Sequence, residues 1–94
     1  MATFVIETYL SRARAGELEA VTARLREAIA SSALTIDRPE PAPPVRWLRS
    51  YFVPEDEVCF HVVEAESADA AFDLGRLAGL SPERVVRAEA TDEG

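Results

Sequence analysis

Three side chains that could take part in chemistry lie in the middle of the chain, Ser50, Cys59 and His61, and the last two are its only cysteine and its only histidine. On one extended strand, Cys59 and His61 would point to the same side, about 7 Å apart. Together with the Ser50 hydroxyl, they could bind a metal ion or supply a general base. The alternative is a packed histidine hydrogen-bonded to the serine, beside a cysteine that belongs to the core.

Two carboxylates, Glu7 and Glu64, lie within apolar, strand-like stretches, where a charge needs a partner. Ion pairs with Arg49 or Arg87, across the sheet or across a dimer, would provide one. An acid–base pair or a metal-binding carboxylate pair is the alternative. The candidate metal ligands are therefore His61 and Glu64. The sequence contains no glycine-rich phosphate loop, zinc-type cysteine spacing or nucleophile elbow, so no catalytic set is evident.

The elements that would position these residues follow from hydrophobic periodicity. Short β-branched and aromatic runs predict four strands, at residues 3–10, 45–53, 58–65 and 84–90. Apolar residues at helical spacing predict two helices, one from Gly16 to about Ser31 and one between Ser67 and Gly79.

The segment 35–44 is rich in proline. It is expected to form a stiff crossover, with a motif for a proline-binding module as the alternative. Residues 91–94 are expected to form a flexible tail.

The order βαββαβ predicts an α+β class protein with a ferredoxin-like fold, in a single domain spanning residues 1–94. Two right-handed crossovers would produce a four-stranded antiparallel sheet in the order 4-1-3-2, with both helices on one face. The other face of the sheet would be left uncovered. Ser50, Cys59 and His61 are expected under the helices.

The register of the central hairpin sorts the remaining side chains between the two faces. Pairing Val53 with Val58 across the turn 54–57 places Ser50 opposite His61 and Trp47 opposite Glu64. Val86 and Ala88 are expected on the helix side. The uncovered face is then expected to hold Glu7, Tyr9, Trp47, Arg49, Tyr51, Phe60, Glu64 and Arg87.

Exposed aromatic side chains gathered in this way are typical of interaction surfaces. We therefore expect a homodimer formed through the uncovered face, in which Arg49 or Arg87 meets a partner's Glu7 or Glu64. A small-molecule cleft on that face is the main alternative.

Composition excludes several classes of partner. A net charge of −7 argues against nucleic acid and against anionic membrane surfaces, both of which require clustered basic residues. No apolar run approaches the roughly 20 residues that cross a bilayer. The lone Cys59 excludes a disulfide within the chain, and with no signal peptide it favours a reducing cytoplasm.

Several short motifs resemble a small bacterial family of domains of unknown function that includes nickel-binding proteins. The main motif is Val45-Arg46-Trp47-Leu48-Arg49-Ser50-Tyr51. It is accompanied by Val5-Ile6-Glu7, by Cys59 followed by Glu64-Ala65, and by Ala78-Gly79-Leu80-Ser81-Pro82. The resemblance implies a ferredoxin-like fold, a dimer, and nickel or another divalent transition metal as a cofactor. Nickel sites usually combine several imidazole and carboxylate ligands, so one histidine per chain would require ligands shared between subunits.

Three functions follow as hypotheses. The first is a cytoplasmic, dimeric, non-enzymatic protein that binds a small ligand or a transition metal such as nickel. The second is an enzyme that resembles dimeric α+β barrel monooxygenases or isomerases and buries a small hydrophobic substrate between sheet and helices. The third is an accessory subunit that docks on another protein through the uncovered face. The fold alone does not choose among them.

Overall fold

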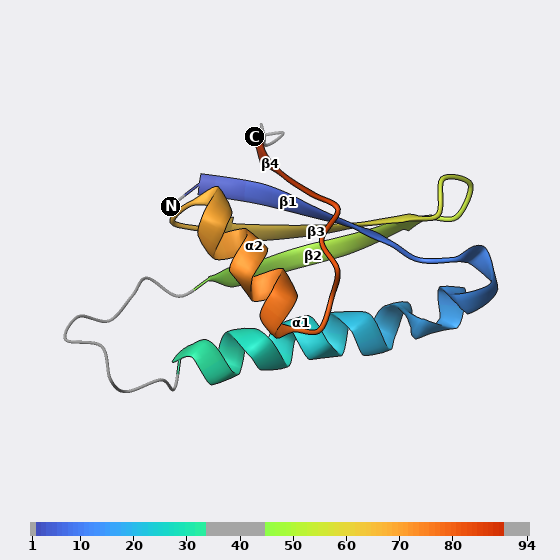
Figure 1. Cartoon of the computed structure of the whole chain (residues 1–94), viewed down its shortest axis with the longest axis horizontal. Helices are drawn as coiled ribbons and strands as arrows, with labels where there is room; N and C mark the ends of the chain where they lie inside the picture. Colours follow the sequence, from blue (N-terminus) through green and yellow to red (C-terminus); the bar gives the residue numbers. More distant parts are fainter. Residues whose placement is uncertain (1, 34–44, 90–94) are drawn as a thin grey trace, which may run out of the picture.

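The computed structural model describes residues 2–33 and 45–89 of the chain (Figure 1). The expected crossover at 35–44 and the tail at 91–94 lie outside these residues. The described elements, in chain order, are β1 (Ala2–Tyr9), η1 (Arg12–Glu17), α1 (Leu18–Ala33), β2 (Arg46–Val53), β3 (Val58–Ala65), α2 (Ala68–Leu77) and β4 (Arg84–Ala88).

The four described strands form one antiparallel sheet in the order β2-β3-β1-β4. This is the expected order read from the opposite edge, so the α+β class and the strand order are confirmed, in agreement with a ferredoxin-like arrangement. Figure 1 shows α2 crossing in front of the sheet and α1 running alongside it.

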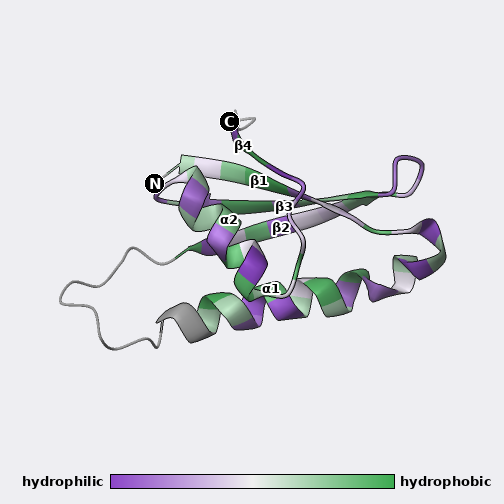
Figure 2. Ribbon diagram, viewed as in Figure 1, coloured by the Kyte–Doolittle hydropathy of each residue, from purple (hydrophilic) through white to green (hydrophobic). Residues whose placement is uncertain are grey.

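The core lies between this sheet and the two helices. Strand residues Phe4, Ile6 and Val63 are buried against Leu25 of α1 and Leu74 of α2. Along β1 and β3 every second residue is buried, which is the pattern of strands with one face covered. In Figure 2 the same strands are largely hydrophobic, whereas α1 alternates between hydrophobic and hydrophilic residues.

Local signals explain where the helices begin and end. Ser11 caps η1 by accepting the backbone N–H of Ala13 at 3.2 Å, so helical structure begins before the expected Gly16. Ser67 caps α2 in the same way. After α2, Gly79 adopts a φ of 79°, the left-handed conformation that glycine tolerates best, and thereby turns the chain toward β4.

The expected register of the central hairpin holds from Arg49 to Val53, but the expectation for Trp47 is wrong. A bulge between Trp47 and Arg49 places Trp47 opposite Val63, and Arg46 takes the position opposite Glu64. One extra residue reverses the side to which the preceding side chains point. Trp47 therefore lies on the helix side, where the Arg26 guanidinium of α1 stacks 5.4 Å from its ring.

The expected assignment of the β4 side chains to the two sheet faces is also wrong, because the strand is shifted by one residue from the expected register. Val85 pairs with Ile6 and packs against the core, whereas Val86 pairs with Val5 on the uncovered face. Arg87 consequently leaves the predicted uncovered face, as it pairs with Phe4, and Ala88 moves onto it. The strand reads Arg-Val-Val-Arg, which is symmetric, so alternation of residue types could not select between the two registers.

The uncovered face contains exposed aromatic residues and two ion pairs. Tyr9 and Tyr51 are 61% and 52% exposed. Glu7 pairs with Arg84 at 3.7 Å and Glu64 pairs with Arg46 at 3.1 Å, both within the chain.

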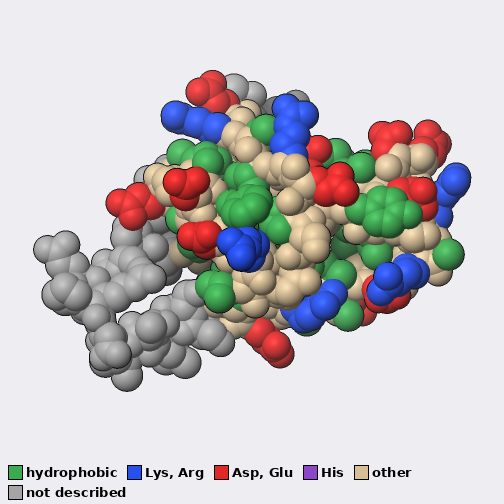
Figure 3. Space-filling view, in the orientation of Figure 1, with side chains coloured by type: hydrophobic (Ala, Val, Ile, Leu, Met, Phe, Trp, Pro, Cys, Tyr) green, Lys and Arg blue, Asp and Glu red, His purple; other side chains and the backbone are tan. Residues whose placement is uncertain are grey.

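The opposite side of the molecule, which includes α2, carries acidic and basic side chains interspersed with hydrophobic ones (Figure 3). It shows no large area of a single charge sign.

Candidate functional site

A chain of hydrogen bonds crosses the covered side of the sheet, with His61 at its centre. The Trp47 indole Nε1–H donates to Ser50 Oγ at 3.0 Å. Ser50 Oγ lies 2.7 Å from Nδ1 of His61, and Thr8 Oγ1 lies 3.2 Å from Nε2 of the same ring. The sequence predicted the contact between Ser50 and His61, and the structure adds Thr8 and Trp47 to it.

The direction of these bonds follows from the groups that make them. An indole N–H can only donate, so Ser50 accepts from Trp47 and has its own proton available for Nδ1 of His61. With the Ser50 proton directed to Nδ1, the ring carries its proton on Nε2 and donates it to Thr8. This polarity leaves the Thr8 hydroxyl proton available for another acceptor.

Burial keeps the imidazole neutral. His61 has no solvent exposure, and desolvation lowers its pKa from 6.5 to about 4. Both ring nitrogens have partners, so the buried group is fully satisfied. At neutral pH His61 is therefore an uncharged, oriented side chain.

Cys59 lies beside Thr8 in the register of β1 and β3 and is fully buried. Burial raises the pKa of the Cys59 thiol, and a hydrogen bond from Thr8 partly opposes this shift. The thiol is therefore protonated at neutral pH, whereas a reactive cysteine requires a lowered pKa. Its position indicates packing rather than nucleophilic chemistry.

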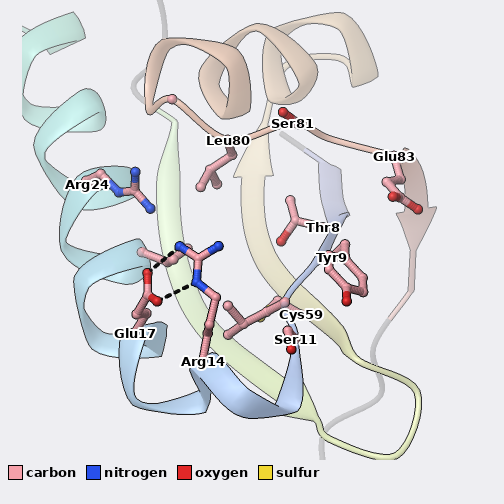
Figure 4. Close-up of a pocket in the computed structure, with 13 residues that line it drawn as sticks. Thr8, Tyr9, Ser11, Arg14, Glu17, Arg24, Cys59, Leu80, Ser81 and Glu83 are labelled. Atoms are coloured by element: carbon pink, nitrogen blue, oxygen red, sulfur yellow. Dashed lines mark hydrogen bonds and ion pairs between the residues drawn. The ribbon is translucent and has the colours of Figure 1, made fainter.

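A cleft of about 420 Å³ opens at the end of the sheet nearest these residues. Figure 4 shows Thr8 and Tyr9 reaching it from β1, Leu80 and Ser81 from the loop after α2, and Arg14 and Arg24 from the side of η1 and α1. Its apolar lining includes Leu10, Val21 and Leu80. The cleft thus combines guanidinium groups, hydroxyl groups and an apolar surface.

Several contacts fix the wall that carries the arginines. The backbone N–H of Arg12 donates to Glu57 Oε2 at 2.8 Å, which ties η1 to the turn between β2 and β3. Arg14 donates through Nε and Nη2 to the Glu17 carboxylate at 2.5 and 2.7 Å. The hydrogen bond with Arg14 lowers the pKa of Glu17, so the pair is ionised at neutral pH.

A second, shallower groove of about 450 Å³ runs between α1 and β2, past Arg26, Trp47 and Ser50. Ser50 therefore borders this groove, while Thr8 and Cys59 border the cleft. His61 lies between them and lines neither. The three residues predicted to converge are therefore only partly in contact. Ser50 is hydrogen-bonded to His61, whereas Cys59 is connected to His61 through Thr8.

Thr8 and the two cleft arginines are the residues that sequence reasoning missed. Thr8 follows Phe4 and Ile6 on the same face of β1, so a polar residue on a buried face was the available signal. Arg14 and Arg24 had no comparable signal, because solvent-facing arginines are common on helices.

The described residues do not form a metal site within one chain. Among residues 2–33 and 45–89, no group of three or more His, Cys, Asp or Glu side chains could hold a metal ion. His61 and Glu64 point to opposite faces of β3, and both nitrogens of His61 already have partners. None of the described helices is long and apolar enough to cross a membrane.

Comparison with known proteins identifies two similarities. The family model described as "Nickel responsive protein SCO4226-like" matches residues 6–87. The crystal structure of SCO4226 from Streptomyces coelicolor A3(2) superposes with a TM-score of 0.73 and 12% sequence identity, over 97% of this chain and 100% of that chain. At this identity the structural similarity shows the fold alone. No curated protein matches the chain.

Proposed function

This chain belongs to the SCO4226-like nickel responsive protein family, and on that basis we propose that it is a dimeric, non-enzymatic binding protein that holds a small ligand in the cleft beside Thr8 and Cys59. The cleft is the observation that carries the proposal. Its volume of about 420 Å³ falls in the range typical of small-molecule sites, and its wall combines a few polar groups with apolar residues. The reduced thiol of Cys59 is in keeping with a cytoplasmic protein.

The uncovered sheet face supports the dimer. Tyr9 and Tyr51 are more than half exposed, and Phe60 and Val62 lie partly exposed between them on β3. Glu7 and Glu64 already have arginine partners within the chain, so pairing of two copies does not have to neutralise them. This differs from the expected contact in which Arg49 or Arg87 would meet a partner's carboxylate.

Nickel, the metal in the family's description, does not fit the described side chains of a single copy. Its usual imidazole ligand is here a buried His61 with both nitrogens occupied. A metal bound by this protein would have to combine donors from two copies. Glu7 and Glu64, on the uncovered face, would contribute only by exchanging their arginine partners, Arg84 and Arg46, for the metal.

The proposal is tested with protein purified without a histidine tag. Metal analysis for nickel, zinc and copper is combined with thermal unfolding in the presence of each metal and of a panel of small organic molecules. We expect cleft-binding molecules to raise the midpoint of unfolding by several degrees at concentrations well above their Kd. If neither metals nor small molecules shift the midpoint, the proposed function is wrong.

Two substitutions locate the binding site. Ser81→Trp places a large side chain at the rim of the cleft, and Asp73→Trp places the same side chain on the exposed side of α2. We expect the first to abolish the ligand-induced shift and the second to preserve it. Equal loss in both variants, or no loss in either, would place the ligand elsewhere.

The second candidate function is an enzyme that acts on a small hydrophobic substrate, similar to dimeric α+β barrel monooxygenases or isomerases. The volume of the cleft is the observation that favours it. The described lining argues against it, because the only imidazole lies behind Thr8 and does not reach the cleft. Incubation of a cleft-binding molecule with the protein, followed by mass spectrometry, distinguishes the two. Recovery of the unchanged molecule agrees with binding, and conversion to a product would establish the enzyme.

A further inference from the structure

We propose that the ligand of the cleft is a small carboxylic acid, whose carboxylate binds Arg24 together with the free edge of Arg14. This inference rests on the proposed function, because it names the class of ligand for the same site.

Arg14 is held in place with one edge unused. Its Nε and Nη2 bind Glu17, and among the described residues no hydrogen bond involves its Nη1. Figure 4 shows the Arg14 guanidinium directed into the cleft with the Glu17 carboxylate beside it. Glu17 therefore orients the group and neutralises most of its charge, while one N–H edge stays accessible.

Arg24 supplies the remaining positive charge. It comes from α1, and within the described part of the chain it has neither a hydrogen bond nor an ion pair. Its Nη1 lies 4.0 Å from the point where a Cβ on Gly79 would be, so the guanidinium rests against the turn that ends α2. The carbonyl end of a helix favours a cation, which helps to hold Arg24 at the cleft.

The charges around the cleft favour a monoanion over a dianion. The described lining has two arginines, Arg14 and Arg24, and two carboxylates. Glu17 binds Arg14 and also interacts electrostatically with Arg24, whereas Glu83 lies on the far wall in Figure 4. The chain contains no lysine that could assist. A planar carboxylate matches the fork of a guanidinium, whereas a phosphate dianion would meet the carboxylates of Glu17 and Glu83 with too little positive charge.

The remaining lining residues indicate the chemical nature of the part of the ligand that lies beyond its carboxylate. The hydroxyl groups of Thr8 and Ser81 border the cleft, and Leu10, Val21 and Leu80 provide its apolar surface. A short aliphatic or aromatic acid would place its carboxylate at the arginines and its body against these residues. The volume of about 420 Å³ accommodates a molecule of that size.

The experiment compares acids with their uncharged amides. Hexanoate and benzoate are titrated against hexanamide and benzamide, with inorganic phosphate as a third arm, at pH 7 by calorimetry and thermal shift. We expect each acid to bind about 10- to 100-fold more tightly than its amide, the effect of one charged hydrogen-bonding partner. Tighter binding of phosphate than of either acid would overturn the inference.

Matched variants assign the effect to Arg24. Arg24→Gln should remove the preference for acid over amide, and Arg24→Lys should retain part of it. Arg26→Gln makes the same change of charge on the same helix, at a side chain stacked on Trp47 outside the cleft, and should leave the preference intact.

Two other outcomes separate this inference from the proposed function. Equal binding of acids and amides, blocked by Ser81→Trp, would overturn the carboxylate inference and leave the proposed function standing. Absence of binding by every probe would count against both.

Discussion

At the scale of single residues, the buried His61 organises the covered side of the sheet. Its two ring nitrogens join Ser50 of β2 to Thr8 of β1, so one imidazole links three adjacent strands. Trp47 and Cys59 extend this link at its two ends. A satisfied polar network of this kind fixes one arrangement of the core, because each group would lose its partner in any other.

The lowered pKa of His61 predicts a pH-dependent stability. The pKa is 6.5 in the unfolded chain and about 4 in the folded one, so between these values the unfolded state binds the additional proton. The free energy of unfolding should therefore decrease as the pH falls from 6.5 to 4, by about 3 kcal/mol in total, and should be independent of this group above 6.5.

Urea unfolding of the wild type and of His61→Gln at pH 7 and at pH 4.5 measures this effect. The variant should be less stable at pH 7 but should lose less stability on acidification, because the buried imidazole is gone. Parallel pH profiles for the two proteins would contradict the prediction.

At the scale of elements, the cleft depends on how closely α2 approaches the sheet. Gly75 lies on the buried side of α2, where an added Cβ would be 2.8 Å from Pro82 Cγ and 3.6 Å from Ile6 Cγ2. The absence of a side chain lets the helix, β1 and the loop that borders the cleft pack together. Gly16, in η1, has nothing within 4 Å of such a Cβ.

Substituting alanine at these two glycines should have opposite effects. Gly75→Ala should lower the free energy of unfolding by about 1–2 kcal/mol, because the cost of overpacking exceeds the helix propensity gained. Gly16→Ala should leave stability unchanged or raise it by up to about 1 kcal/mol. Chemical denaturation measures the free energy of unfolding of both variants. If Gly75→Ala were as stable as the wild type, the contact between position 75 and Pro82 would not be tight.

At the scale of the whole molecule, the two faces of the sheet have different roles. One is covered by α1 and α2 and contains the hydrogen-bonded chain and the core. The other exposes Tyr9 and Tyr51 among ion pairs. A sheet with exposed aromatic side chains on its uncovered face buries more surface by pairing with a second copy, and this is the basis for the proposed dimer.

The dimer predicts a specific effect on molecular mass in solution. Light scattering should yield twice the chain mass of 10.3 kDa for the wild type. Tyr51→Arg, on the uncovered face, should shift the protein to the monomer. Leu77→Arg, at a hydrophobic residue of α2 that is 72% exposed, introduces the same charge away from that face and should stay dimeric. A monomeric wild type would favour the accessory-subunit hypothesis instead.

The amino-acid sequence was sufficient to predict the order of strands and helices, the strand order of the sheet, and the contact between Ser50 and His61. These depend on periodicity, which is a local property: alternation along β1 and β3 marks the covered face, and the hairpin turn places residues 49–53 opposite 58–62. The family resemblance is confirmed by the family model, which matches residues 6–87.

The directions of Trp47 and Arg87 and the surroundings of His61 could be read only from the folded chain. The bulge before Arg49 and the register of β4 depend on packing against distant parts of the chain, and a shift of one residue reverses the face without changing the pattern. The cleft arises in the same way. Arg14, Arg24, Thr8 and Ser81 are separated in sequence and meet because η1, α1, β1 and the loop after α2 converge at one end of the sheet.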